Sequence, residues 1–288
     1  MSLPLVPSLS SLGGSLSGPG GAATVGLAAL FVALTAVETL RPLVRRPVES
    51  RGRLLTNFGL GLLSFGLGAL LPLSVPGAAL LAGRNGWGLL NLADFPAWLE
   101  ASATVLAVSL AHYLFHRAAH AWPLLWRVHR VHHADTAVDL STTLRNHPIE
   151  LLVVAPWLCA VTLALGLSAP VLAAYQVVAL GFGLWGHANL RLPEPVDRAL
   201  RLVLVTPPMH HVHHSTDPRE TDSNFGDILS LWDRLFGTYT PRPLIGLGAM
   251  RRGLGDAEDA TAGHFARQLA RPFRPAEPST ARAIASGE

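Results

Sequence analysis

The sequence predicts an all-α membrane protein: about four to five transmembrane helices and a helical cytoplasmic cap that holds a histidine-rich site for two metal ions. Half of the 288 residues are hydrophobic and only 14% are charged, whereas soluble globular proteins usually contain about a quarter charged residues. Thirteen histidines are present, and all but His264 lie between residues 112 and 214. The composition therefore indicates a membrane protein, and the clustered histidines indicate a metal-binding region.

Five segments are candidate membrane spans, since a helix needs about 20 apolar residues to cross the hydrocarbon core. They are residues 22–40, 55–72, 97–115, 150–167 and 170–187. The last two are short and closely joined, so they are either separate crossings or a tight hairpin that does not fully cross. Prolines and glycines interrupt the apolar residues between the second and third spans, and the sequence leaves the position of residues 73–96 open.

The arginines predict the orientation, because cytoplasmic loops are enriched in basic residues. The connection after the first span contains Arg41, Arg45, Arg46, Arg51 and Arg53. The opposite side carries a single arginine, between the second and third spans. The arginine-rich connection is therefore expected in the cytoplasm, and counting the spans forward brings every histidine group to that same face. We expect an integral protein of a bacterial inner membrane.

The chain is expected to contain one membrane-embedded domain between two tails. Residues 1–22 carry no charged side chain and lack the basic start of a secretory signal, so we predict a flexible N-terminal tail. Residues 23–240 form the domain, with its motifs between 112 and 240. Residues 241–288 show no strong periodicity and are expected to be a loosely packed C-terminal cytoplasmic tail with one short helix near 261–270.

Several function classes are disfavoured. The net charge is only +3, and the sequence has neither a block of basic residues nor a recognisable nucleic-acid motif, so nucleic-acid binding is not predicted. The single cysteine, Cys159, excludes internal disulfides and cysteine-based metal sites. The sequence contains no H-E-x-x-H, which argues against a zincin-type membrane protease.

The histidines have metal-ligand spacing. One group is spaced i, i+4, i+8 and would form one stripe on a helix. Two groups have the spacing H-x-x-H-H, which covers an arc of roughly 100° on a helix, and a single histidine ends the last span. In chain order they are His112, His116 and His120; His129, His132 and His133; His187; and His210, His213 and His214. A lone histidine is ordinarily a surface or hydrogen-bonded residue, but metal ions supply partners for many crowded rings at once.

The number of candidate ligands favours two metal ions over one. A structural zinc site closes with four ligands and typically uses cysteine. Nine imidazoles exceed that number and suit two ions with four or five ligands each. Imidazole binds iron, copper, nickel and zinc, so ligand type alone does not identify the metal.

The order of these motifs resembles the fatty acid hydroxylase/sterol desaturase superfamily of membrane di-iron oxygenases. The resemblance runs from about residue 112 to 240, close to half of the chain. Its motifs are His116–His120, Leu125–His133, Leu144–Glu150, Gly186–Asn189, Thr206–His214, Asp222–Gly226 and Trp232–Tyr239. Each motif alone is weak, whereas the ordered set is specific.

The resemblance implies a role for each motif residue. The implied metal ligands are His116, His120, His129, His132, His133, His187, His210, His213 and His214. The implied supporting residues around them are His112, His147, Glu150, Asn189, Asp222 and Asn224. His211 is expected to be a neighbour and His264 to be solvated, while Ser109 stands where many relatives carry an acid. No catalytic residue beyond the metal centre is implied.

The resemblance also implies the chemistry. Two iron ions, which zinc can replace on purification, would use O2 as co-substrate to hydroxylate or desaturate a C–H bond of a membrane lipid such as a sterol, fatty acyl or alkyl lipid. The sequence shows no cysteine-ligated cluster and no nucleotide-binding glycine fingerprint, so the expected electron donor is a separate ferredoxin, cytochrome or reductase. The sequence predicts neither the substrate nor the oligomeric state.

Two other classes stay open. A zinc-dependent membrane hydrolase would keep its activity without oxygen. A non-catalytic membrane metal-binding protein would place polar residues well inside the spans, and the spans here are almost purely apolar.

Overall fold

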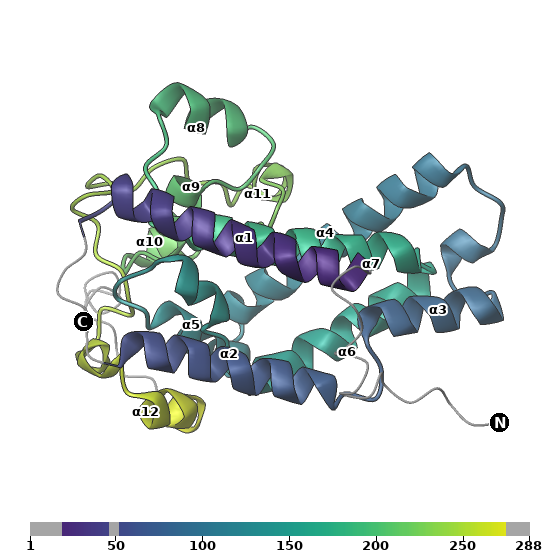
Figure 1. Cartoon of the computed structure of the whole chain (residues 1–288), viewed down its shortest axis with the longest axis horizontal. Coiled ribbons are helices and arrows are strands. Elements are labelled where there is room, and N and C mark those ends of the chain that lie inside the picture. The colour runs from purple at the N-terminus through teal and green to yellow at the C-terminus, as the bar shows by residue number, and fades with distance from the viewer. Residues whose placement is uncertain (1–18, 46–51, 275–288) are drawn as a thin grey trace.

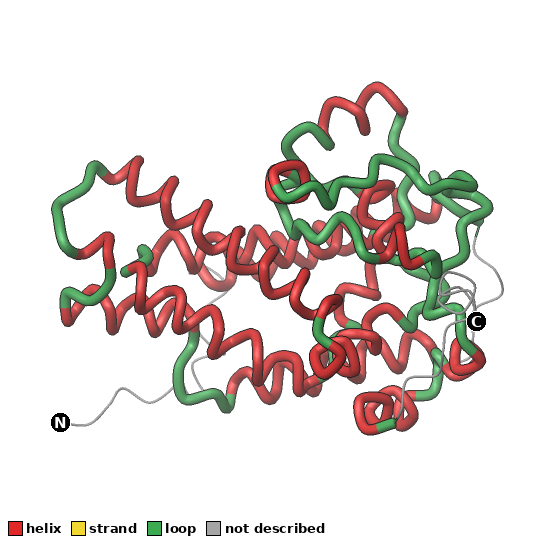
Figure 2. The backbone as a smooth tube through the Cα atoms, turned by 180° about the vertical axis from the view of Figure 1, so that it is seen from behind, coloured by secondary structure: helices red, strands yellow, loops and turns green. Residues whose placement is uncertain are grey.

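The computed structural model describes residues 19–45 and 52–274, which fold as helices; the only strand pairing in these ranges consists of isolated bridges. Long helices extend to one side, and loops and short helices gather at the other end, which we call the cap (residues 122–147 and 188–274; Figure 2). The helices are α1 (Pro19–Leu40), α2 (Arg53–Ala69), α3 (Val75–Asn85), α4 (Ala97–Ala121), α5 (Pro123–His133), α6 (Pro148–Leu165), α7 (Ala169–His187), α8 (Glu194–Leu200), α9 (Pro207–His213), α10 (Pro218–Thr221), α11 (Leu231–Leu235) and α12 (Phe265–Ala270). Short 3-10 helices are η2 (Leu89–Asn91), η3 (Leu140–Leu144), η4 (Ala257–Thr261) and η5 (Arg271–Phe273).

Four helices are long and apolar enough to cross a membrane by their length and composition: α1, α4, α6 and α7. At most 28% of the most apolar stretch of each is buried, so most of their apolar side chains face outward, as contact with lipid requires. The remaining expected span corresponds to α2, which has 17 residues and is shorter than these four. Its exposed Leu55, Leu62 and Phe65 nevertheless give it an apolar outer face.

Residues 73–96, which the sequence left open, form α3 and the connection to α4. Ser74 begins α3 by accepting a hydrogen bond from the backbone N–H of Gly77, and Gly86 ends it with a φ of 65°. Figure 1 shows α3 farther from the cap than α2. The completely buried Ala78 and Ala82 lie on this helix, which packs against α6 and α7; such small residues let helices approach closely.

Helices α6 and α7 form a hairpin that extends away from the cap. Its tip is Gly166, which ends α6 with a φ of 69°. A Cβ atom on Gly88, in the loop after α3, would lie 2.1 Å from the backbone nitrogen of Gly166. The hairpin thus reaches the α3–α4 connection, at the opposite end of the long helices from the cap.

Only part of each predicted tail lies within the described residues. Residues 1–18 and 275–288 lie outside the described residues, while residues 19–22 already belong to α1. The short helix expected near 261–270 is present as α12, but the loose packing expected for this segment is wrong over 241–274. Ala262 and Gln268 are completely buried there, because side chains of the cap bind its backbone: Arg145 donates to the carbonyl oxygen of Ala262, and Arg130 to that of Arg271.

Candidate metal centre

The structure brings together all nine histidines that the sequence predicted as metal ligands. They come from the cap ends of α4 and α7, from α5, and from α9 and the residue that follows it, and they form two groups. The five-histidine group contains His116, His120, His129, His133 and His213, and the four-histidine group contains His132, His187, His210 and His214. Within each group the candidate ligand nitrogens lie within 4.8 Å of one another. The groups adjoin, since the rings of His133 and His214 stack with their centroids 4.6 Å apart.

Each H-x-x-H-H motif contributes to both groups, in opposite senses. In the first motif the i and i+4 rings join the five-histidine group, and the i+3 ring, His132, joins the four-histidine group. In the second motif the i and i+4 rings join the four-histidine group, and the i+3 ring, His213, joins the other. A helix explains the division: positions i and i+4 are rotated by only about 40°, whereas i+3 points about 60° to the other side of i.

Acceptors outside the cluster fix the outer nitrogen of most of the rings. Four Nδ1 atoms face backbone carbonyl oxygens: His116 faces Phe225 at 2.9 Å, His132 faces Arg145 at 3.3 Å, His187 faces Gly183 at 2.8 Å, and His213 faces Ser223 at 2.7 Å. Two more face carboxylates: His129 faces Glu150 at 2.8 Å, and His120 faces Asp222 at 3.1 Å. A carbonyl oxygen only accepts, so the facing Nδ1 carries the proton and Nε2 is left as a lone pair directed inward.

The inward nitrogens fit metal cations. The Nε2 atoms of His132 and His187 are 3.0 Å apart, and those of His116 and His129 are 3.1 Å apart. In each pair both Nδ1 atoms are the donors, so the two Nε2 lone pairs cannot hydrogen-bond to each other. Both nitrogens of His214 are buried without a hydrogen-bond partner. Buried polar atoms ordinarily have partners, and a cation held between these rings satisfies several of them at once.

The cap histidines are also in the protonation state that metal binding requires. Burial, followed by repulsion from neighbouring rings, lowers the pKa of His132, His133, His210 and His214 well below the ordinary value of 6.5. Burial also lowers the pKa of His213 to about 3. These rings are therefore neutral at physiological pH, and their lone pairs need no deprotonation before they bind a metal.

Of the six predicted supporting residues, two contact rings of the cluster directly. Glu150 and Asp222 each accept a hydrogen bond from a ring of the five-histidine group. His147 instead begins α6, accepting from the backbone N–H of Ile149. The other supporting residues are likewise not in hydrogen-bond contact with the nine rings.

Asn189 and Asn224 stabilise loops. The side chain of Asn189 bonds to both backbone groups of Val44. Asn224 adopts a φ of 54°, a left-handed conformation that asparagine tolerates, and its amide donates to the carbonyl oxygens of Met209 and Thr240. His112 lies one turn before His116, and its Nδ1 is 3.9 Å from the carboxylate of Asp227.

Two of the four histidines outside the predicted ligand set, His211 and His264, were predicted to be neither ligands nor supporting residues. The Nε2 of His211 bonds to the carbonyl oxygen of His187, and its Nδ1 accepts from Arg252, so it is a neighbour of the cluster. His264 is exposed and begins α12. Ser109 accepts a hydrogen bond from the indole of Trp232 at 2.7 Å.

A buried ion-pair network beneath the cluster was not predicted. Arg53, one of the arginines that the sequence predicts in the cytoplasmic connection, is buried and paired with Asp135 and Asp139. Burial disfavours the charged form of Asp135, but Arg53 and Arg145 outweigh this cost and lower its pKa to about 2. The backbone carbonyl of Arg145 in turn holds His132. No sequence signal could pair residues more than 80 positions apart. The predicted Arg46 and Arg51 lie outside the described residues.

Asp233 fixes the loop that holds His116. Its carboxylate accepts from the backbone N–H groups of Phe225 and Gly226 at 2.8 and 2.9 Å. The carbonyl oxygen of Phe225 then accepts from His116. A Cβ atom on Gly226 would lie 2.4 Å from the carbonyl oxygen of Leu229, so this tight turn requires glycine.

A cavity of about 740 Å³ adjoins the cluster. Rings from both groups line it: His116 and His129 from one, and His132, His187 and His210 from the other. Its other walls come mainly from apolar side chains and glycines of α2, α6 and α7. The volume is typical of a small-molecule site, and its chemistry suits a hydrocarbon chain.

Comparisons with known proteins agree with the site. The sequence model of the fatty acid hydroxylase family matches residues 101–238. The chain is 37% identical over 136 residues to an alkylglycerol monooxygenase of Danio rerio, covering 47% of this chain and 29% of that protein. It is 33% identical over 186 residues to an ornithine lipid hydroxylase of Rhizobium tropici, covering 61% and 52%.

The human alkylglycerol monooxygenase is 33% identical over 153 residues, covering 52% of this chain and 33% of that protein. The chain therefore spans about a third to a half of the length of these curated relatives. No solved structure matches. The matched segment contains all nine clustered histidines, and over residues 101–238 the chain matches the fatty acid hydroxylase family.

Proposed function

We propose that this chain is an integral membrane enzyme that uses two iron ions and O2 to hydroxylate a C–H bond of a membrane lipid. The observation that carries the proposal is the pair of adjoining histidine groups with inward lone pairs, opening on an apolar cavity. The names of two relatives, an alkylglycerol monooxygenase and an ornithine lipid hydroxylase, support a lipid as the substrate.

The nine clustered histidines would hold the metal. Iron bound there would supply the activation of O2 that oxidation of an unactivated C–H bond requires. The chain's own groups orient the rings: backbone carbonyls, Glu150 and Asp222 hold the Nδ1–H groups, so that each Nε2 is directed inward. Apolar side chains such as Phe115, Leu151 and Leu180 line the cavity, which excludes water and accommodates an alkyl chain.

The cavity also suits entry from the bilayer. It extends between α2, α6 and α7, whose outer faces are apolar. Hydroxylation and desaturation both begin with attack on a C–H bond, and the names of the relatives support hydroxylation. We also propose that the two electrons needed per turnover come from a separate ferredoxin, cytochrome or reductase.

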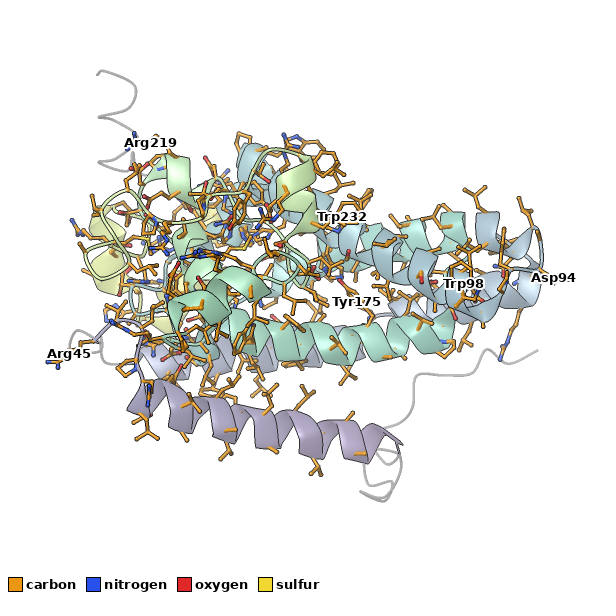
Figure 3. All side chains as sticks on the ribbon, turned by 90° about the horizontal axis from the view of Figure 1, so that it is seen from above. Arg45, Asp94, Trp98, Tyr175, Arg219 and Trp232 are labelled. Atoms are coloured by element: carbon orange, nitrogen blue, oxygen red, sulfur yellow. The ribbon has the colours of Figure 1, made fainter. Side chains whose placement is uncertain are left out.

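The cap is proposed to face the cytoplasm of a bacterial inner membrane. Figure 3 shows Arg45 and Arg219 at the cap end of the molecule, and Asp94 and Trp98 at the opposite tip. Exposed arginines thus gather at the cap, whereas Arg84 lies beyond the membrane helices on the other side. This distribution supports a cytoplasmic cap.

The test is metal analysis combined with isotope labelling of the purified chain. We expect about two irons per chain and incorporation of one ¹⁸O atom from ¹⁸O2 into a membrane lipid, in the presence of a chemical or enzymatic electron source. His132→Ala should abolish the incorporation, whereas His264→Ala, which changes an exposed histidine, should not. Turnover without oxygen by a protein that retains only zinc would contradict the proposal and favour a hydrolase.

A further inference from the structure

The cavity has polar side chains that are not among the residues proposed to hold the metal. His112 and Asp227 both line the cavity, and the hydroxyl of Tyr175 donates to Oδ2 of Asp227 at 2.8 Å. In Figure 3 Tyr175 lies in the middle of the molecule, between the far tip marked by Trp98 and the cap marked by Arg219. A carboxylate that lines a largely apolar cavity is costly unless it has hydrogen-bonding partners.

The two side chains are spaced to share one ligand atom. Nδ1 of His112 is 3.9 Å from Oδ2 of Asp227, which is too far for a direct hydrogen bond. A single oxygen atom at about 2.8 Å from each would span this distance with an angle of about 90° at that oxygen. A hydroxyl can accept from the imidazole and donate to the carboxylate at the same time. The side chains are 31% and 25% exposed, which leaves them accessible from the cavity.

The charges of the cavity select against anions. Neither arginine nor lysine is among its lining residues in the described part of the chain, and its acidic residues are Glu150 and Asp227. A carboxylate or phosphate beside Asp227 would meet a like charge, with no arginine or lysine in the lining to pair with it. A neutral hydroxyl avoids this repulsion and uses both partners.

The polar group is rigidly connected to the metal centre. His112 lies one turn before His116 on α4, a separation of about 6 Å along the helix axis. Asp227 directly follows Phe225 and Gly226, whose backbone N–H groups donate to Asp233. The carbonyl oxygen of Phe225 accepts from His116. A group bound between His112 and Asp227 is therefore held about one helical turn from the metal ligands.

We propose that His112 and Asp227, with Tyr175 orienting the carboxylate, bind a hydroxyl group of the lipid substrate and thereby determine which carbon faces the metal centre. The substrate class is a lipid alcohol, oxidised close to its hydroxyl end, and not a free fatty acid. The inference rests on the proposed function only where it calls the bound lipid a substrate. The binding site itself is testable without turnover.

The test measures binding of three matched probes to the full-length metal-loaded protein without oxygen: hexadecanol, its methyl ether and palmitic acid. We expect hexadecanol to bind about ten-fold or more tightly than the other two, since only the alcohol both accepts from His112 and donates to the carboxylate of Asp227. Asp227→Asn should reduce this preference and Tyr175→Phe should weaken it less. Asp94→Asn, an acid changed at the far tip, should leave it intact.

The outcomes separate this inference from the proposed function. Equal binding of the three probes to the wild-type protein would overturn the hydroxyl site, even if the enzyme hydroxylates a lipid. Tighter binding of hexadecylamine than of hexadecanol would also overturn it, in favour of an ammonium site. A preserved preference in a protein that never oxidises lipid would support the site and contradict the function. If Asp227→Asn fails to fold, His112→Leu tests the same preference from the other side.

Discussion

Removing the charge of Glu150 should selectively weaken metal binding by the five-histidine group. Glu150 contacts His129 alone among the nine clustered histidines, through the 2.8 Å contact with its Nδ1, and its side chain is only 14% exposed. His129 belongs to the five-histidine group. Glu150→Gln keeps an oxygen that accepts from Nδ1–H, so the ring orientation is preserved while the charge is lost.

The expected size follows from the kind of hydrogen bond that is changed. A hydrogen bond to a charged group contributes about 1.5–3 kcal/mol and a neutral one about 0.5–1.5 kcal/mol. The difference of about 1–1.5 kcal/mol corresponds to roughly a ten-fold loss of affinity for the ion in the five-histidine group. Glu150→Leu removes the acceptor as well and should approach the upper end of the about 10–100-fold range for such supporting residues.

The assay is iron content per chain after dialysis against a graded series of chelator concentrations. Glu150→Gln should release one iron at about ten-fold lower chelator activity than the wild type and retain the other. Asp222→Asn is the matched control, because its carboxylate also faces a ring of the same group but is 43% exposed, so that solvent screens its charge. Parallel loss of both ions, or a larger effect from Asp222→Asn, would refute the reasoning.

Two further predictions concern stability. Arg53→Gln leaves the buried Asp135 and Asp139 without their shared cation. It should lower the free energy of unfolding, measured by denaturation in detergent, by about 3–5 kcal/mol. The control Arg198→Gln removes an exposed ion pair and should lower it by less than about 1 kcal/mol. In the metal-free protein, the pKa of His213 is about 3 in the folded chain and 6.5 in the unfolded chain. As the pH falls, the unfolded chain therefore binds the proton first. The stability present above pH 6.5 should decrease as the pH drops from 6.5 towards 3. A transition midpoint that does not change between pH 7 and 5 would contradict the second prediction.

The sequence predicted which histidines meet, but not how they divide. Spacing places three rings of an H-x-x-H-H motif on one arc, and that follows from helix geometry alone. Which of the two groups each ring joins depends on how α5 and α9 are oriented against each other, and this is a tertiary property. The opposite roles of His132 and His213, each the i+3 member of its motif, therefore required the structure.

Charged residues were the least predictable part of the site. Arg53 follows a basic connection, and the sequence before it is typical of a loop. Its side chain is nevertheless buried, because it pairs with Asp135. The segment after residue 240 has no periodic pattern of apolar residues. Polar contacts stabilise much of it instead, since arginine side chains of the cap donate to its backbone carbonyls. Hydropathy patterns detect apolar faces, and they carry no information about such contacts.

The contacts around the rings make the two histidine groups chemically different. Both contacting carboxylates, Glu150 and Asp222, act on the five-histidine group, whereas the carbonyls of Arg145 and Gly183 orient rings of the four-histidine group. Carboxylates increase the basicity of a ring more than carbonyls do, because they carry charge. Three of the four rings in the second group line the cavity, compared with two of five in the first. The four-histidine group thus combines fewer candidate ligands with neutral support and more contact with the cavity, so a metal ion held there would be the more accessible of the two to reactants. The five-histidine group, with more ligands and charged support, is the better suited to retain its ion, and the Glu150 variants act on that difference directly.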